Sequence, residues 1–246
     1  MIAKKRDAQS DVIQALEAQA ESTRDLLKRG ACISAALRLR TDSPTKRAAQ
    51  HIDLYFAQRE DWAVIHDLRM RVGSHAIQIN HVLIHNSLQI YCLDSRYMNC
   101  QIELTGNGQY KVLNAVKTQS IASPLVKMSK DVRLLKSCLE SAGWAPKRFG
   151  IKLNTDVRGG VLVGAKTVKK NERFRFSNVG IYPGETLFTG ICERDRYRSS
   201  FLRGRLSSDA LAELAALLVR QHMPIFPPHL LGDPTSTPLD LSADAC

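Results

Sequence analysis

Residues 77–97 constrain the fold more than any other part of the chain. They include most of two apolar runs, residues 76–84 and 88–93, which are rich in strand-favouring residues and are separated by turn-forming residues at 85–87. Runs of this length, broken by a turn, are typical of paired strands rather than of a helix. The segment therefore predicts a β-hairpin.

Among the polar residues of this hairpin, three are candidate site residues: Asn80, Asp94 and Arg96. Because side chains two apart in a strand leave the same face, we expect Asp94 and Arg96 to lie together. With a turn at 85–87, Asn80 would face Cys92 and lie diagonal to Asp94, at about 7–8 Å, within the reach of a bridging metal ion. The alternative is an ordinary half-buried hairpin whose polar residues face water.

Two motifs in the hairpin are Gln78-Ile79-Asn80-His81 and Leu93-Asp94-Ser95-Arg96-Tyr97. Together with residues 62–69 and the Ser-Pro pair at 123–124, they resemble the nuclease-related domain (NERD) family of the restriction-endonuclease-like PD-(D/E)xK superfamily. The first motif is similar to the family's Gln-x-Asp-His, with Asn in place of Asp. The second is similar to its Glu-Ser-Lys, with both functional residues changed. The likeness is strong over roughly residues 44 to 135 and weaker to about residue 222.

The resemblance implies an α/β fold with a restriction-endonuclease-like mixed central β-sheet flanked by helices. It also implies a site in which two carboxylates hold Mg²⁺ at the scissile phosphate, while a lysine orients the attacking water. Each of these roles is weakened here. Asn80 removes one negative charge, Asp94 retracts its carboxylate by about 1.5 Å relative to Glu, and Arg96 grips phosphate better than it orients water.

Asp94 and Asn80 are therefore weak metal ligands at most. We expect Mg²⁺ if the site is active and otherwise no cofactor. The neighbouring motif positions that the resemblance assigns are Gln78, His81, Tyr97 and Lys127, the last of which stands where Gln is common in the family.

The upstream acidic ligand of the family is also missing. Family members carry Gly-Glu at the start of the preceding helix, where this chain has Pro44 and Thr45. The nearby acids that could substitute are Asp42, Asp53 and Glu60, and Asp53 is expected to be an exposed helix residue. Because groups in such a site act as a unit, we favour a weak or inactive site over an active one.

The net charge of +11 is concentrated after the hairpin, since residues 147–205 contain 14 Lys or Arg and 5 Asp or Glu. Basic residues interleaved with aromatic ones suit phosphate contacts and base stacking, although a charge run is also typical of an ordinary solvated face. With the family resemblance, this pattern favours DNA as the partner. The candidate nucleic-acid-binding residues are Lys166, Lys169, Lys170, Arg173, Arg175, Arg194, Arg196 and Arg198.

Other chemistry is disfavoured. His66, His81 and His85 fall on or beside predicted strands without ligand spacing, so they are expected to be structural, and the six cysteines show no zinc pattern and are expected to be reduced thiols. Without an apolar run near 18 residues, we expect no membrane contact. The absence of a secretory signal at the start favours a cytoplasmic location. The oligomeric state is not indicated.

The predicted organisation has four parts: a helical extension over 1–42, a nuclease-related core over 43–145, a basic continuation of the same domain over 146–223, and a flexible tail over 224–246. We expect helices at 10–29, 44–56, 124–142 and 208–222, and strands at 62–68, 76–84, 88–94, 101–104, 110–116, 149–153, 160–164 and 179–182.

Three functions follow from this reading. The favoured one is a DNA-binding protein with a degenerate PD-(D/E)xK site. The first alternative is an active, divergent Mg²⁺-dependent DNA nuclease. The second is a non-catalytic interaction or regulatory protein on a nuclease-like scaffold.

Overall fold

The computed structural model describes residues 1–40, 43–97, 101–104, 110–113, 118–141, 147–148, 151–152, 155–164, 178–184, 190–191 and 205–223. The eight candidate DNA-binding residues and the predicted tail lie outside these ranges. So does the acid Asp42.

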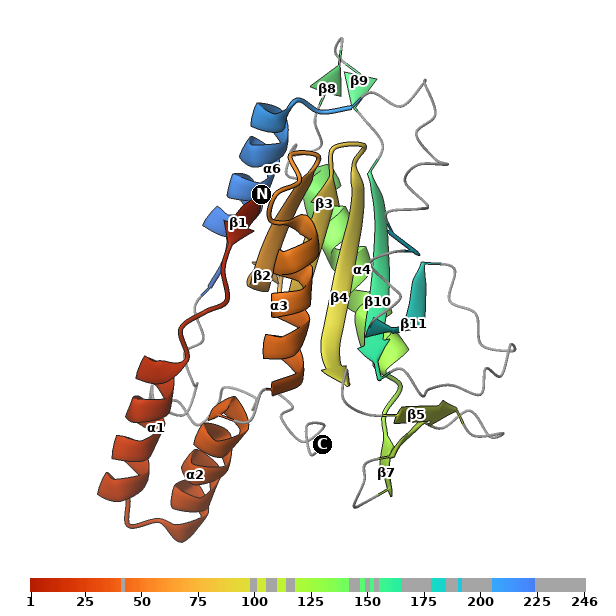
Figure 1. The fold of residues 1–246 in the computed structure, drawn as a ribbon. Helices are drawn as coiled ribbons and strands as arrows, with labels where there is room; N and C mark the ends of the chain where they lie inside the picture. Colours follow the sequence, from red (N-terminus) through yellow and green to blue (C-terminus); the bar gives the residue numbers. More distant parts are fainter. Residues whose placement is uncertain are drawn as a thin grey trace.

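A six-stranded mixed sheet forms the centre of the protein (Figure 1). The first four strands in spatial order are joined parallel, antiparallel and antiparallel, and the last two join by parallel pairing. This is the mixed α/β architecture that the sequence predicted, consistent with a restriction-endonuclease-like fold. The strands in order are β1 (Ile2–Lys4), β2 (Trp62–Val72), β3 (His75–His85), β4 (Gln89–Tyr97), β10 (Asp156–Val163) and β11 (Val179–Pro183).

Helices cover both faces of this sheet. On one face α3 (Ser43–Phe56) buries Ala48, Ile52 and Phe56 against apolar strand residues. On the other, α4 (Pro124–Ser141) and α6 (Ser208–Arg220) contribute to the larger core cluster. Figure 1 shows α3 and α4 on opposite sides of β3 and β4. The sheet is thus covered on both sides, which explains why β4 is almost continuously buried.

A glycine sets the distance between α4 and the sheet. A Cβ atom added to Gly159 of β10 would lie 2.5 Å from Cγ of Met128 and 3.0 Å from Cγ2 of Val132. Only glycine therefore allows the helix to approach β10 this closely.

The predicted single helix over 10–29 is wrong, because the chain forms two helices, α1 (Ser10–Ser22) and α2 (Leu26–Arg40). The break has a local cause. The Asp25 carboxylate accepts hydrogen bonds from the backbone N–H groups of Leu27 (2.9 Å) and Lys28 (3.3 Å) and so caps a new helix. The two helices pack as a hairpin around Leu16, Ala20, Cys32 and Ala36.

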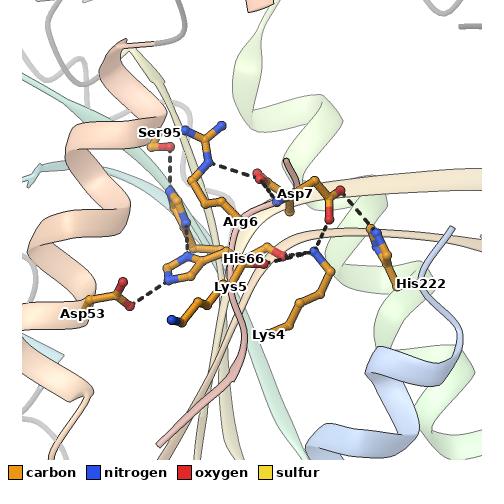
Figure 2. Close-up of polar contacts among 10 residues, drawn as sticks. Lys4, Lys5, Arg6, Asp7, Asp53, His66, Ser95 and His222 are labelled. Atoms are coloured by element: carbon orange, nitrogen blue, oxygen red, sulfur yellow. Dashed lines mark hydrogen bonds and ion pairs between the residues drawn. The ribbon is translucent and has the colours of Figure 1, made fainter. Parts of the chain in front are cut away.

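Residues before α1 join the main sheet, which the sequence did not predict. β1 pairs with β2, and Lys4 Nζ donates to the backbone oxygen of His66 at 2.9 Å. Figure 2 shows Asp7 between this strand and His222, whose Nε2 lies 3.2 Å from the Asp7 carboxylate. The start of the chain therefore links β2 to the end of α6.

Shorter strands complete the described structure. Of the predicted strand over 110–116, the described residues 110–113 form a strand, and a further strand at 118–121 pairs with it. Of the predicted strand over 149–153, the described residues 151–152 form a two-residue strand, which pairs with another at 147–148. These elements are β5 (Gln101–Leu104), β6 (Tyr110–Leu113), β7 (Thr118–Ile121), β8 (Lys147–Arg148) and β9 (Ile151–Lys152).

The predicted hairpin exists, but its register is two residues away from the predicted one. Val82, not Asn80, lies opposite Cys92, and the ladder ends at the pair of His81 and Leu93. A shift of two residues keeps each side chain on its expected face. If this register is continued by one residue pair beyond the end of the ladder, Asn80 lies opposite Asp94 rather than diagonal to it.

The turn explains the shift. His85 belongs to β3, where it pairs with Trp62, and its ring centroid lies 4.7 Å from that of the indole. The connection is therefore formed by residues 86–88 and is closed by the N–H of Leu88, which donates to the His85 oxygen at 2.9 Å. Leu88 has a left-handed φ of 63°, an unusual conformation for a leucine that its sequence does not indicate.

Candidate functional site

The centre of the site is an ion pair within β4. Arg96 binds both carboxylate oxygens of Asp94, with Nε at 3.1 Å from each and Nη2 at 2.7 Å from Oδ2. Asp94 is only 4% exposed. Burial alone would raise the pKa of Asp94, but the Arg96 guanidinium, with a smaller contribution from Lys127, holds the pKa below its ordinary value. Asp94 is therefore ionised and already paired.

Asn80 contributes to strand pairing. Its Oδ1 accepts a hydrogen bond from the backbone N–H of Ser95 at 3.2 Å. Asn80 lies on β3 at the one position where the paired residues of β2 and β3 are interrupted. The residue at the interrupted position of β2 is Asp67, which has a φ of 51°. The oxygen that would bind a metal ion thus holds β4 in place.

A second ion pair faces the first from α4. Lys127 Nζ lies 2.9 Å from Oδ2 of Asp131 and 3.3 Å from the backbone oxygen of Gln78. Asp131 is 4% exposed. Burial raises the pKa of Asp131 above its ordinary value against the attraction of Lys127, and the charge of Asp94 adds to the increase. We call Asp94, Arg96, Lys127 and Asp131 the charged quartet.

Sequence reasoning missed Asp131. The signal was available, because this acid lies three residues after Met128 and four before Leu135, within the apolar stripe of the helix. A carboxylate at a core-facing helical position requires a partner. Its partner Lys127 lies one turn earlier in the same helix, whereas the nearby charge of Asp94 depends on the fold, because Asp94 lies far away in sequence.

The remaining motif positions take different places. Gln78 has an exposed side chain. The ring of Tyr97 lies 5.6 Å from the Arg96 guanidinium carbon, at the distance of a cation–π contact. His81 is fully buried on the α3 side of the sheet, where its Nε2 lies 2.8 Å from Ser95 Oγ.

The candidate upstream acid Asp53 also lies on the α3 side. Its Oδ1 is 2.9 Å from Nε2 of His66, and its side chain is 44% exposed (Figure 2). Asp53 is therefore engaged by a histidine and is separated by the sheet from the charged quartet. At the positions of the family's Gly-Glu, Thr45 is buried and offers no carboxylate.

These observations agree with a comparison between this chain and known protein families. Residues 44–154 match the family model of the nuclease-related domain, NERD. This segment is a nuclease-related domain. The family belongs to the restriction-endonuclease-like PD-(D/E)xK superfamily, so the predicted family and fold are confirmed. No curated protein and no solved structure gives a significant match.

The nuclease-related domain includes both the hairpin and α4, so the whole charged quartet lies within it. Nuclease-related domains usually depend on a divalent metal. The quartet does not fit such an ion, because Arg96 binds both oxygens of Asp94 and Lys127 binds Asp131. Within the described ranges, no three His, Cys, Asp or Glu side chains are grouped to hold a metal. None of the described helices is both long and apolar enough to span a membrane.

Proposed function

We propose that this nuclease-related protein binds DNA through a PD-(D/E)xK site that is catalytically weak or inactive. The observation that carries the proposal is the ion pair between Asp94 and Arg96. A metal ion would have to displace a bidentate guanidinium from the one motif carboxylate that the hairpin retains. The structure of the motif thus survives, while its metal-binding charge is neutralised by the chain itself.

DNA binding is supported by the family and by the positive charge of the chain. The charged quartet contains two anions and two cations, so it provides little net attraction for DNA. The attraction is assigned to the basic residues between Lys166 and Arg198, and the quartet is assigned local contacts to bound DNA in which its internal ion pairs stay closed. The proposal includes a cytoplasmic location, which suits the free thiols of Cys32, Cys92 and Cys138.

Asp131 favours a second candidate function, an active but divergent nuclease that uses Mg²⁺. It brings a second buried carboxylate to the face of Asp94 and partly replaces the charge lost at Asn80. In this alternative both ion pairs of the quartet must open before a metal can bind.

One experiment separates the candidates. The purified full chain is incubated with single- and double-stranded DNA in Mg²⁺, Mn²⁺ or a chelator, and binding and cleavage are measured together. The proposal expects salt-sensitive binding in all three conditions and no metal-dependent cleavage. Cleavage that requires a metal and disappears in Asp94→Ala and in Asp131→Ala would establish the active alternative. The absence of both binding and cleavage would favour a scaffold for other interactions.

A further inference from the structure

A chain of hydrogen bonds crosses the α3 side of the sheet. It runs from Ser95 Oγ to His81 Nε2 (2.8 Å), from His81 Nδ1 to His66 Nδ1 (2.8 Å), and from His66 Nε2 to Asp53 Oδ1 (2.9 Å). Ser95, His81 and His66 are fully buried, whereas the Asp53 side chain reaches solvent. Figure 2 shows the contacts as a continuous path from α3 to β4. The hydrogen-bond path therefore links the surface of α3 to Ser95, which lies between Asp94 and Arg96 in β4, the site strand.

The chemistry of the groups fixes the direction of every bond when both rings are neutral. A carboxylate only accepts, so the hydrogen of His66 lies on Nε2 and its Nδ1 is an acceptor. His81 must then carry its hydrogen on Nδ1 and accept at Nε2 from the Ser95 hydroxyl. The neutral state of His81 is supported by its pKa, which burial holds well below the ordinary value, and to which the repulsion of a protonated His66 and then the charge of Arg6 would add.

Ser95 connects this chain to the candidate site. Its side chain points to the α3 side, while its neighbours Asp94 and Arg96 point to the α4 side, as strand alternation requires. Its backbone N–H holds Asn80 Oδ1 at 3.2 Å. A rotation of the strand at Ser95 would therefore move all three motif side chains.

We propose that Asp53, His66, His81 and Ser95 are positioning residues that hold the site strand in its DNA-contacting geometry. Asp53 fixes the tautomers of both histidines, and the oriented His81 holds the Ser95 hydroxyl. Without Asp53, the buried imidazoles lose the acceptor that fixes the direction of the hydrogen bonds. A buried polar group is then left unsatisfied, and its free-energy cost destabilises the present conformation of β4. The inference rests on the proposed DNA-binding function for its effect, although the hydrogen-bond order itself does not.

The hydrogen-bond order is tested by ¹⁵N spectroscopy of the histidine rings in the full chain at about pH 8, where ordinary histidines are neutral. We expect His66 with its hydrogen on Nε2 and His81 with its hydrogen on Nδ1. A wild-type protein with both hydrogens on Nε2 would overturn the inference whatever the DNA result.

The positioning effect is tested by comparing Asp53→Ala with Glu140→Ala, which removes the same charge from a helix position of similar exposure. On charge alone, either substitution should strengthen DNA binding slightly. If Asp53 positions the site strand, Asp53→Ala should instead weaken the affinity for DNA several-fold. The backbone amide NMR signals of Ser95 and Arg96 should also shift. Unchanged signals and affinity in Asp53→Ala would refute it. If the wild type shows the expected tautomers and binds no DNA, the proposed function fails and the hydrogen-bond order stands.

Discussion

Removing Arg96 should make the buried carboxylate of Asp94 destabilise the folded protein. In Arg96→Ala the carboxylate stays buried but loses its bidentate partner. Removing one member of a fully buried ion pair costs about 3–5 kcal/mol. Because Arg96 is itself 24% exposed and Lys127 still attracts Asp94, we expect a smaller loss of about 2–3 kcal/mol in the free energy of unfolding at pH 7.

The stability deficit of Arg96→Ala should also change with pH in a defined direction. In the wild type the pKa of Asp94 is lowered, so its stabilising contribution is present above the unfolded pKa and is lost as the pH falls through the folded one. In Arg96→Ala burial dominates and the folded pKa rises above the unfolded pKa. The deficit of the variant should therefore shrink as the pH falls from 7 toward about 4.5.

Urea unfolding at several pH values measures this deficit, with Arg71→Ala at an exposed position of β2 as the control. The reasoning is refuted if Arg96→Ala stays within about 0.5 kcal/mol of the wild type at pH 7, the range of ordinary surface substitutions. A deficit that does not change with pH would refute the role of Asp94 in particular. Arg71→Ala should show neither effect.

Two further predictions concern catalysis and packing. Joint reversion by Asn80→Asp, Asp94→Glu and Arg96→Lys should produce Mg²⁺-dependent cleavage of DNA above the wild-type level; an inert product would mean that the missing upstream ligand is decisive. Gly159→Ala should lower the free energy of unfolding by about 1–3 kcal/mol, since its Cβ would overlap α4. Its control, Gly30→Ala, has open space within α2 and should raise stability by about 0.4–1 kcal/mol, as read from thermal or urea unfolding.

Local sequence patterns predicted most of the central fold. The apolar stripe of α4, the Ser-Pro start of that helix and the two apolar runs of the hairpin are all properties of neighbouring residues. The misses depend on individual contacts. Asp25 caps the start of a second helix where a single helix was predicted, and Leu88 adopts a left-handed conformation at the turn of the hairpin, whose register is two residues away from the predicted one.

Only those contacts of the site that join neighbours in the sequence could be predicted. The pairing of Asp94 with Arg96 follows from their separation by two residues in a strand. The contribution of Asp131 and the path from Asp53 to Ser95 join elements that are distant in sequence, so they depend on how α3 and α4 sit on the sheet. The sequence motif alone showed which of its charged residues are substituted. The fold shows in addition that the one remaining motif carboxylate is neutralised.

Salt dependence provides a final test, because the charged quartet and the basic residues after it should affect DNA binding differently. Each phosphate contact adds about 0.9 to the slope of log affinity against log salt. Replacing Lys169 and Lys170 by Ala should therefore reduce the slope by about 1–2. Arg96→Ala and Asp131→Asn should change the affinity at one salt concentration and leave the slope nearly constant, because both residues are engaged in internal ion pairs. A slope that falls equally in Arg96→Ala would show that the guanidinium leaves Asp94 for DNA, and the quartet would then be a phosphate site rather than a neutralised remnant of a metal site.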